Sequence, residues 1–317
     1  MITMNAASGR LPHFGLLRFS GPDALSFLQG QLSNDTRQLA AGSPLLAAYS
    51  SPQGRVLAVM HLLPHSTGII AILPRELLLP MLQRLRKFVL RAKVQIEDAG
   101  EILSVAGQHG AQALGSAGIV VPDSDAGYSE QDGVGVGRVG PRSNRYWVIG
   151  ATAQLAERGL AGEMLDAQRV EHDWRLADIR AGLPQVYAPT SELFVAQMLN
   201  LDLIDGISFS KGCFTGQEII ARTQHLGRIK RRLFRLHLPP GDWRIGQALH
   251  LTDGRAGRLT ELAGTGEGFE SLAVLNTAAG TAAGTAAGAG AADPESAASA
   301  TVAACELPLP YEQALPA

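Results

Sequence analysis

Apolar and alternating segments predict β-strands through the first half of the chain. Successive side chains of a strand point to opposite faces, so alternation indicates one buried face and an uninterrupted apolar run indicates two. The segments with these patterns are residues 14–19, 56–63, 68–73, 94–98, 103–106 and 145–149. Because strands of this kind need partners, we expect them to form sheets.

Apolar residues three and four positions apart predict three helices among these strands. The first begins at residues 20–23, the second ends near Leu90, and the third spans residues 168–181 and is stopped by Gly182. Pro80 is expected in the first turn of the second helix, where a missing N–H is tolerated. The apolar faces of the first two helices consist of Leu25, Phe27, Leu28 and Leu32, and of Met81, Leu82, Leu85, Phe88 and Val89. Strands and helices mixed without a regular βαβ repeat favour the α+β class.

The chain changes character at residue 233. Residues 233–238 alternate apolar and charged side chains, and turn-rich strands follow through residue 275, which predicts a small C-terminal β-barrel. Residues 276–300 are almost all Ala, Gly, Thr and Ser, so nothing large is buried to offset their ordering entropy, and we expect a flexible loop. Residues 301–311 are expected to return as the last strand. The predicted units are residues 1–232 and residues 233–317.

Composition narrows the class of protein. The chain has 317 residues, 46% of them hydrophobic, which is ample for more than one globular core. Its formal charge of −2 implies no general attraction to polyanions. No segment approaches the ~20 apolar residues that cross a bilayer, so no membrane association is expected. Two cysteines make no disulfide framework, and we expect a protein of a reducing compartment, the cytoplasm.

Two patterns that resemble binding motifs lack the required context. Glycines at 135, 137 and 140 match the spacing of a dinucleotide fingerprint, but Pro141 follows at once and no helix pattern succeeds it. A glycine-rich turn between strands is the expected structure there. His61 and His65 lie four apart in a segment that reads as strand, and no metal-ligand spacing accompanies them. We therefore expect neither a Rossmann site nor a preformed metal site.

The octapeptide at residues 211–218, Lys-Gly-Cys-Phe-Thr-Gly-Gln-Glu, is the strongest chemical signal in the chain. Residues 207–209 read as a short strand, and Thr215 with Glu218 forms a capping box that predicts a helix starting at Thr215. Cys213 would then lie beside the cation of Lys211 and near a helix N-terminus, two features that favour a thiolate. The alternative is a buried cysteine that packs as a small apolar side chain.

This octapeptide, continued through Arg222, resembles the signature of the YgfZ family. Those proteins bind folate, are implicated in the maintenance of iron–sulfur enzymes and in tRNA modification, and are related to the T-protein, the aminomethyltransferase of the glycine cleavage system. Further segments resemble family blocks: residues 27–35 (FLQGQLSND), 53–56 (QGRV), 180–184 (RAGLP) and 307–311 (LPLPY). In the block at 180–184, Arg180 stands where many relatives have Glu.

The resemblance implies a T-protein-like folate-binding region of two interleaved subdomains followed by the β-barrel. It implies tetrahydrofolate as the cofactor, and as partners folate, iron–sulfur proteins or their assembly machinery, and tRNA. The chemical roles fall to Cys213 and Lys211. The residues expected to bind folate are Phe14, Asn34, Asp35, Trp174, Glu192, Gln197, Gln217 and Glu218. Trp174 is placed either to stack near folate or to pack in the core, and Glu192 and Gln197 either line the cavity or lie on a surface loop.

Several alternatives remain open at this point. A tetrahydrofolate-dependent aminomethyltransferase needs a carboxylate near the folate, and the sequence does not place one. A Cys–His hydrolase would use Cys213 as nucleophile, but His225 is about 15 Å away along the expected helix, at ~1.5 Å per residue. A lone cysteine is too few ligands for a resident iron–sulfur cluster, which needs about four. A basic run holds Arg228, Lys230, Arg231, Arg232 and Arg235. It is either a solvated strand edge or an attractor for the folate tail or RNA phosphate.

Overall fold

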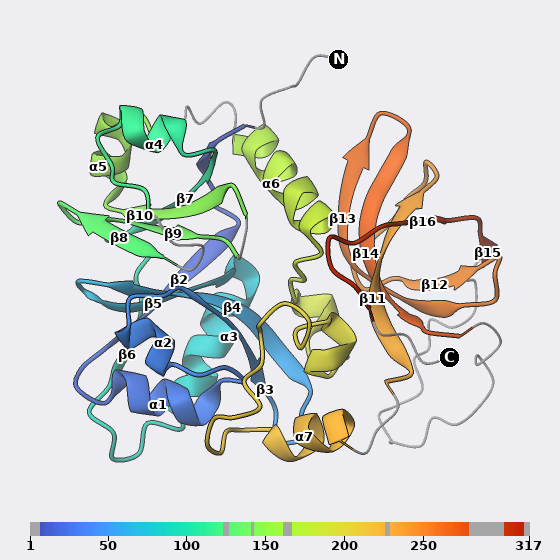
Figure 1. The fold of residues 1–317 in the computed structure, drawn as a ribbon, viewed down its shortest axis with the longest axis horizontal. Helices are drawn as coiled ribbons and strands as arrows, with labels where there is room; N and C mark the ends of the chain where they lie inside the picture. The colour runs from blue at the N-terminus through green and yellow to red at the C-terminus, as the bar shows by residue number, and fades with distance from the viewer. Residues whose placement is uncertain are drawn as a thin grey trace.

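The computed structural model contains three β-sheets and one long helix, α6 (Ala167–Ala181), which lies between two of them (Figure 1). The structure describes residues 7–122, 127–140, 143–160, 167–225, 229–278 and 301–313. Almost all strand pairs are antiparallel, and helices and strands are not arranged as βαβ units. The α+β class expected from the sequence is therefore confirmed.

The first sheet and its helices come from the N-terminal hundred residues. In spatial order its strands are β3 (Leu45–Ser50), β4 (Val56–His65), β5 (Gly68–Pro74), β2 (Phe14–Ser20) and β6 (Gln95–Asp98). The helices that pack against it are α1 (Ala24–Gln31), α2 (Arg37–Ala40) and α3 (Arg75–Arg86). The continuous apolar strands β4 and β5 are buried on both faces, as their sequence predicts.

The second sheet lies above the first in Figure 1. Its strands are β1 (Gly9–Arg10), β7 (Ser104–His109), β10 (Arg145–Gly150), β9 (Val134–Arg138) and β8 (Tyr128–Gln131). Two short helices, α4 (Gln112–Ser116) and α5 (Thr152–Glu157), accompany it. Leu114 and Leu155 of these helices join Tyr146 and Val148 in a compact apolar cluster.

The third sheet curls at the C-terminal side of the molecule (Figure 1). Its order is β15 (Thr301–Val302), β12 (Ala248–Leu251), β13 (Ala256–Thr265), β14 (Gly268–Asn276), β11 (Arg231–Leu238) and β16 (Cys305–Leu307). Helix α6 lies between this sheet and the second one. The two 3₁₀ turns η2 (Ala188–Thr190) and η3 (Ala196–Leu199), and then helix α7 (Gln217–His225), connect α6 to β11.

Several expectations about single elements were wrong. Helix α3 ends at Arg86, so Phe88 and Val89 lie beyond it, and Pro80 is its sixth residue rather than part of its first turn. Gly135 and Gly137 lie inside strand β9, where the Tyr128 and Leu63 side chains occupy the space that a Cβ would need. These glycines therefore serve close packing rather than a turn.

The C-terminal tail also differs from the expectation. Residues 301–311 form two short strands on opposite edges of the sheet, β15 beside β12 and β16 beside β11, instead of one strand. Strand β14 continues through Asn276. Most of the loop expected at residues 276–300, namely 279–300, lies outside the described residues. In the parts of the chain that are described, no helix combines the length and apolarity that a bilayer span requires.

The end of α6 and the C-terminal tail fix one another. Gly182 follows α6 with a φ of +64°, the left-handed conformation typical of a residue that ends a helix. The Tyr311 hydroxyl donates to the Gly182 carbonyl at 2.9 Å, and Asn200 Nδ2 lies 3.3 Å from the same hydroxyl. A Cβ on Gly182 would come within 2.6 Å of the Tyr311 oxygen. Two of the family-like blocks, residues 180–184 and 307–311, thus meet here.

We expect Gly182→Ala to destabilise the protein more than a matched glycine substitution. Gly118 has a φ of +71° and no atom within 4 Å of the place that a Cβ would occupy, so Gly118→Ala carries only the backbone cost of about 1–2 kcal/mol. Gly182→Ala adds displacement of Tyr311, worth about 1 kcal/mol more for the lost hydrogen bond. Urea unfolding of both variants measures the difference. Equal losses would show that the tail does not pack against Gly182.

Candidate functional site

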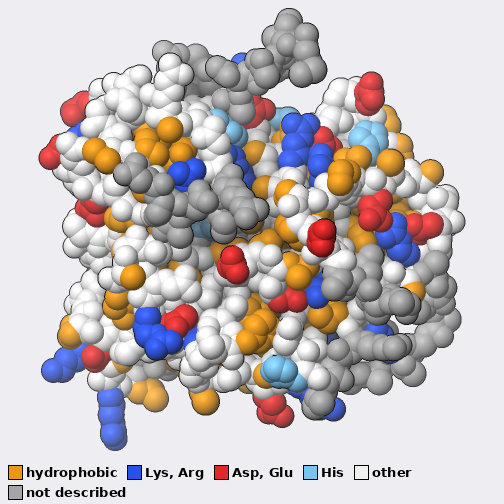
Figure 2. All heavy atoms as spheres, in the orientation of Figure 1, with side chains coloured by type: hydrophobic (Ala, Val, Ile, Leu, Met, Phe, Trp, Pro, Cys, Tyr) orange, Lys and Arg blue, Asp and Glu red, His pale blue; other side chains and the backbone are white. Residues whose placement is uncertain are grey.

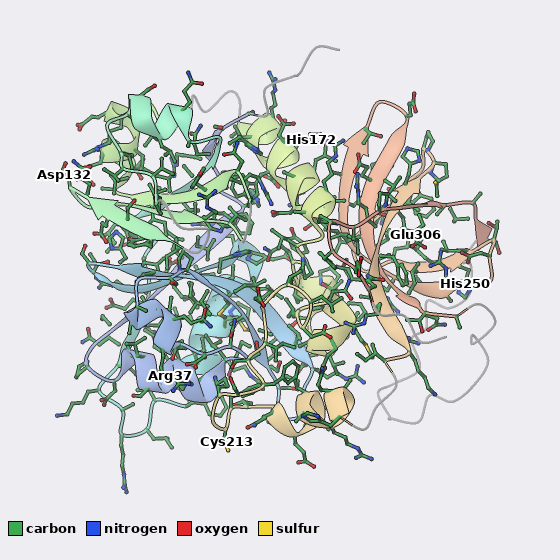
Figure 3. The ribbon with its side chains drawn as sticks, viewed as in Figure 1. Arg37, Asp132, His172, Cys213, His250 and Glu306 are labelled. Carbon is green, nitrogen blue, oxygen red and sulfur yellow. The ribbon has the colours of Figure 1, made fainter. Side chains whose placement is uncertain are left out.

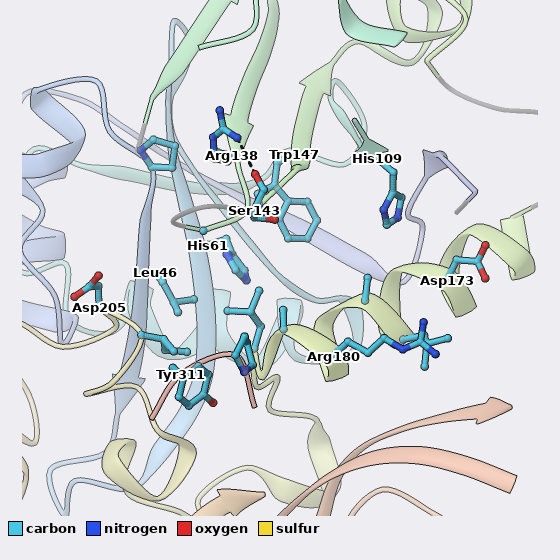
Figure 4. Close-up of a pocket in the computed structure, with 18 of the residues that line it drawn as sticks. Leu46, His61, His109, Arg138, Ser143, Trp147, Asp173, Arg180, Asp205 and Tyr311 are labelled. Atoms are coloured by element: carbon cyan, nitrogen blue, oxygen red, sulfur yellow. Dashed lines mark hydrogen bonds between the residues drawn. The ribbon is translucent and has the colours of Figure 1, made fainter. Parts of the chain in front are cut away.

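A cavity of about 1370 Å³ lies where the three sheets, α6 and the C-terminal tail meet (Figure 4). Strands β3 and β4 of the first sheet form one wall, β7, β9 and β10 of the second sheet another, and the β13–β14 turn and the tail close the third side. Side chains from α6 between His172 and Ala181 line its length. The cavity is thus assembled from segments that are far apart in the sequence.

The apolar part of the wall centres on Trp147 of β10. Its ring lies 4.8 Å from the Trp174 ring, 5.2 Å from Phe14 in an edge-on arrangement and 5.1 Å from His61. Trp147 and His61 line the cavity, whereas Trp174 and Phe14 are buried and do not. The Trp147 Nε1–H is buried and donates to no described group. A flat aromatic wall with an unpaired donor suits a planar, hydrogen-bonding ligand.

Two arginines bring positive charge to the cavity. Arg138 donates to the Ser143 carbonyl at 2.8 Å and has no carboxylate partner among the described residues. Arg180 pairs with Glu270 at 2.6 Å, but Glu270 also pairs with Arg235 at 2.6 Å. Two guanidiniums therefore share one carboxylate. Near these two guanidiniums an anionic group of a ligand is favoured, whereas Asp173 and Asp205 bring negative charge to other parts of the lining.

Two histidines on the cavity wall are held neutral. Burial lowers the pKa of His61 to about 3, and the nearby Arg145 guanidinium lowers it further. Burial likewise lowers the pKa of His109 to about 4, with Arg145 again contributing in the same direction. A neutral imidazole offers one donor and one acceptor. These rings therefore suit the polar edge of an uncharged heterocycle. In the described parts of the chain, no three His, Cys, Asp or Glu side chains cluster as a metal site would require.

None of the ten residues proposed from the sequence lines this cavity. Phe14 and Trp174 lie directly behind Trp147, so they support the wall without forming it. Gln197 is fully buried and donates to the Ile220 carbonyl, which ties η3 to α7. Glu192 is exposed, with a φ of +65°.

Sequence reasoning missed the residues that do line the cavity: Trp147, His61, His109, Arg138, Asp173, Asp205 and Tyr311. One signal was available. Trp147 lies in a short strand that was predicted from the sequence and that is buried throughout. A tryptophan in a buried strand packs either in a core or against a ligand. Arg180, noted only as a departure from the family block, is also a lining residue.

Lys211 does not face the cysteine of its motif. Its ammonium donates to the carbonyls of Gln29, Leu32 and Asn34 at 2.6, 2.7 and 2.9 Å, at the C-terminal end of α1. These bonds use all three donors of the ammonium. Burial lowers the pKa of Lys211 to about 8, while the negative charge of Asp35 opposes that shift. Lys211 therefore anchors the motif loop to α1.

The rest of the motif region follows from this anchor. Residues 207–209 form no strand, and Ser208 N–H makes a single backbone bond to the Ser33 carbonyl. Helix α7 begins at Gln217 instead of Thr215, because Gly216 takes a φ of +83°. The Gln217 side chain accepts from the Phe214 N–H at 3.3 Å. Thr215 therefore does not occupy the N-cap position that the expected capping box requires, and the Gln217 bond holds the loop that precedes the helix.

Two of the family-like blocks, residues 27–35 and 53–56, contact this loop. Thr215 N–H bonds to the Gly30 carbonyl, and Asn34 Nδ2 donates to the carbonyls of Leu46 and Asp205. A Cβ on Gly216 would come within 2.7 Å of the Ser51 carbonyl, so the 51–54 turn presses against the loop. Asp35 pairs with Arg37, and Glu218 is exposed.

Cys213 projects from the surface of this braced loop. Its side chain is exposed at the lower edge of the molecule in Figure 3, and Cys305 is exposed as well. The alternative that Cys213 packs as a buried apolar side chain is therefore wrong. The cavity and the cysteine are separate features of the fold, since the cavity lining does not include Cys213.

We expect Lys211→Met to lower the free energy of unfolding by about 2 kcal/mol or more, because three carbonyls lose their donor. Lys93→Met is the control, since Lys93 is exposed and its side chain contacts no described partner. Urea unfolding measures both. A loss no larger than that of the control would mean that the three bonds do not hold the loop.

Comparison with known proteins identifies sequence relatives of this chain. No family model matches the chain. A "tRNA-modifying protein YgfZ" of Edwardsiella ictaluri is 34% identical over 228 residues, which cover 71% of this chain and 69% of the relative. One of the same name from Cronobacter sakazakii is 32% identical over 243 residues, 73% of each chain.

A solved structure shares the fold. The glycine cleavage system aminomethyltransferase T from Bartonella henselae superposes with a TM-score of 0.61, covering 86% of this chain and 79% of that one, at 15% identity. That similarity confirms the T-protein-like architecture expected from the sequence. With the sequence relatives it shows that this chain belongs to the YgfZ family.

Proposed function

We propose that the central cavity binds a reduced folate and that the protein acts as an accessory factor in tRNA modification and iron–sulfur enzyme maintenance. The observation that carries the proposal is the wall built by Trp147, His61 and the two arginines around a cavity of about 1370 Å³. Supporting it, the curated relatives are named as tRNA-modifying proteins, and the structural relative is an aminomethyltransferase.

The chemistry of the lining matches the parts of a folate. The pterin is a flat heterocycle with hydrogen-bonding edges, which suits Trp147 and the neutral His61. The glutamate carries carboxylates, which suit Arg138 and Arg180 as fork-shaped donors. Ligand sites usually measure about 300–1,000 Å³, so this cavity leaves room for a longer glutamate tail or a second molecule.

We propose a separate role for Cys213. Its thiol is exposed on a loop that is anchored by Lys211, so it is presented to a partner at a fixed position. A single thiolate binds iron only when other ligands complete the coordination. Cys213 would therefore contribute one ligand to iron or to a cluster that a client or carrier protein holds.

Folate binding predicts a change in tryptophan fluorescence that depends on Trp147. We expect 5-formyltetrahydrofolate to bind and quench the emission, and Trp147→Phe to remove most of the quench and weaken binding by about tenfold, or about 1.4 kcal/mol. Trp243→Phe is the matched control, because Trp243 lies outside the cavity lining and bonds to the Pro239 carbonyl. Titration calorimetry measures the affinity independently of fluorescence.

The arginines allow a second readout in the same experiment. Arg138→Gln should weaken the binding of 5-formyltetrahydrofolate. It should leave the affinity for 6-methyltetrahydropterin, which has no glutamate, unchanged. No heat with either compound at high protein concentration would refute the folate proposal. If the variant lost affinity for both compounds equally, Arg138 would not be the group that binds the folate carboxylate.

Cys213→Ala should abolish the accessory function while leaving folate affinity unchanged. The measurement is iron–sulfur enzyme activity in cells that lack the endogenous gene and carry the wild type, Cys213→Ala or Cys305→Ala. Cys305 is the matched control because it is the other exposed thiol. Full activity with Cys213→Ala would eliminate the proposed role for this thiol.

A further inference from the structure

A cluster of unpaired cations lies on the segment that joins α3 to β6. We call residues 87–93 the basic segment. Lys87, Arg91 and Lys93 are exposed, and within the described parts of the chain their side chains form no hydrogen bond or ion pair. Between them, Phe88 is 42% exposed and Leu90 is 86% exposed. The segment runs along the lower left edge in Figure 1, and Lys, Arg and hydrophobic side chains project from that edge in Figure 2.

The backbone beneath these side chains is fixed. The Arg86 guanidinium donates twice to the Ile96 carbonyl, at 2.9 and 2.7 Å. The Lys93 N–H donates to the Asp23 carboxylate at 2.6 Å, and the Lys93 carbonyl accepts from the Asp23 N–H at 3.3 Å. Val89 and Ala92 pack inward against the core. The backbone of the basic segment is therefore held in place, so binding has to order only its exposed side chains.

The other basic run behaves differently. Arg232 is buried and pairs with Asp202 at 2.6 Å, and Arg235 pairs with Glu270. Arg231 donates to the Asn276 side chain at 3.1 Å. Arg228 lies outside the described residues. The run at 228–235 thus neutralises much of its charge inside the protein, whereas the basic segment keeps its charge free for a partner.

We propose that the basic segment is a contact surface for single-stranded or loop RNA. Three free cations suit successive phosphates, and an exposed phenylalanine between them suits a stacked base. The nearby carboxylates are already engaged, Asp23 by the Lys93 N–H and Glu97 by Arg18. A membrane surface is the weaker fit, because two apolar side chains bury too little area for stable anchoring. This surface does not depend on folate binding.

The experiment uses a fluorescein-labelled single-stranded RNA of about 12 nucleotides and measures anisotropy between about 50 and 200 mM salt. The triple variant Lys87→Gln, Arg91→Gln, Lys93→Gln should bind at least about tenfold more weakly. The slope of log K against log salt should fall by about 2, since each phosphate contact on a single strand contributes about 0.7. The control triple is Arg222→Gln, Lys230→Gln, Arg231→Gln, which removes the same charge and should change binding less than about twofold.

A substitution at Phe88 distinguishes stacking on a base from a general apolar contact. Phe88→Leu should weaken RNA binding without changing the salt slope, because stacking involves no counterion. Vesicles of phosphatidylcholine and phosphatidylserine form the second arm, where Phe88→Leu should matter little. Equal losses for both triple variants, no binding to the wild type, or binding to vesicles but not RNA would each overturn the proposal. All substituted side chains are exposed, so we expect the variants to have the melting temperature of the wild type. This measurement checks that each variant is folded.

Discussion

The position of α6 between two sheets depends on buried ion pairs at its two flanks. Asp178 pairs with Arg145 of β10 at 2.6 Å, and Arg175 pairs with Glu261 of β13 at 2.8 Å. Burial raises the pKa of both Asp178 and Glu261, against the opposing charge of their arginines. A buried charge that loses its partner costs about 3–5 kcal/mol, so each pair restricts where the helix can lie. The cavity remains open beside a helix fixed in this way.

The same constraint explains why the cavity combines apolar walls with charge. The Arg145 guanidinium lies 4.9 Å from the Trp174 ring, and Trp174 supports Trp147 from behind. That guanidinium also helps to keep His61 neutral. One buried arginine therefore pairs with a helix, packs against the tryptophan that supports the cavity wall, and adds to the burial that keeps His61 neutral. A mutation at Arg145 would disturb all three together, so it cannot report on ligand binding alone.

Local patterns were sufficient for the sheets but not for the site. The buried strands β4, β5 and β10 were predicted because strand periodicity is contained in a few consecutive residues. The cavity depends instead on which segments meet, and no periodicity brings Trp147 to His61 or Tyr311 to Gly182. The motif shows the same limit, because a separation of two residues suggested that Lys211 lies beside Cys213. In the fold, the lysine turns away to three carbonyls that precede it by about 180 positions.

The two basic runs, residues 228–235 and 87–93, differ in how many of their charges remain available to a partner. From the sequence, the run at 228–235 was expected to be either a solvated strand edge or an attractor for an anion, and it holds more arginines than the basic segment. Strand β11 lies inside its sheet, and its arginines at 232 and 235 lie on opposite faces of the strand, where each meets a carboxylate, Asp202 or Glu270. The segment after α3 is not part of a sheet, because it follows a helix that ends at Arg86 and precedes a strand that begins at Gln95. Its cations are therefore free to point outward. Whether a charged run is available to a partner follows from the element that carries it more than from the number of charges.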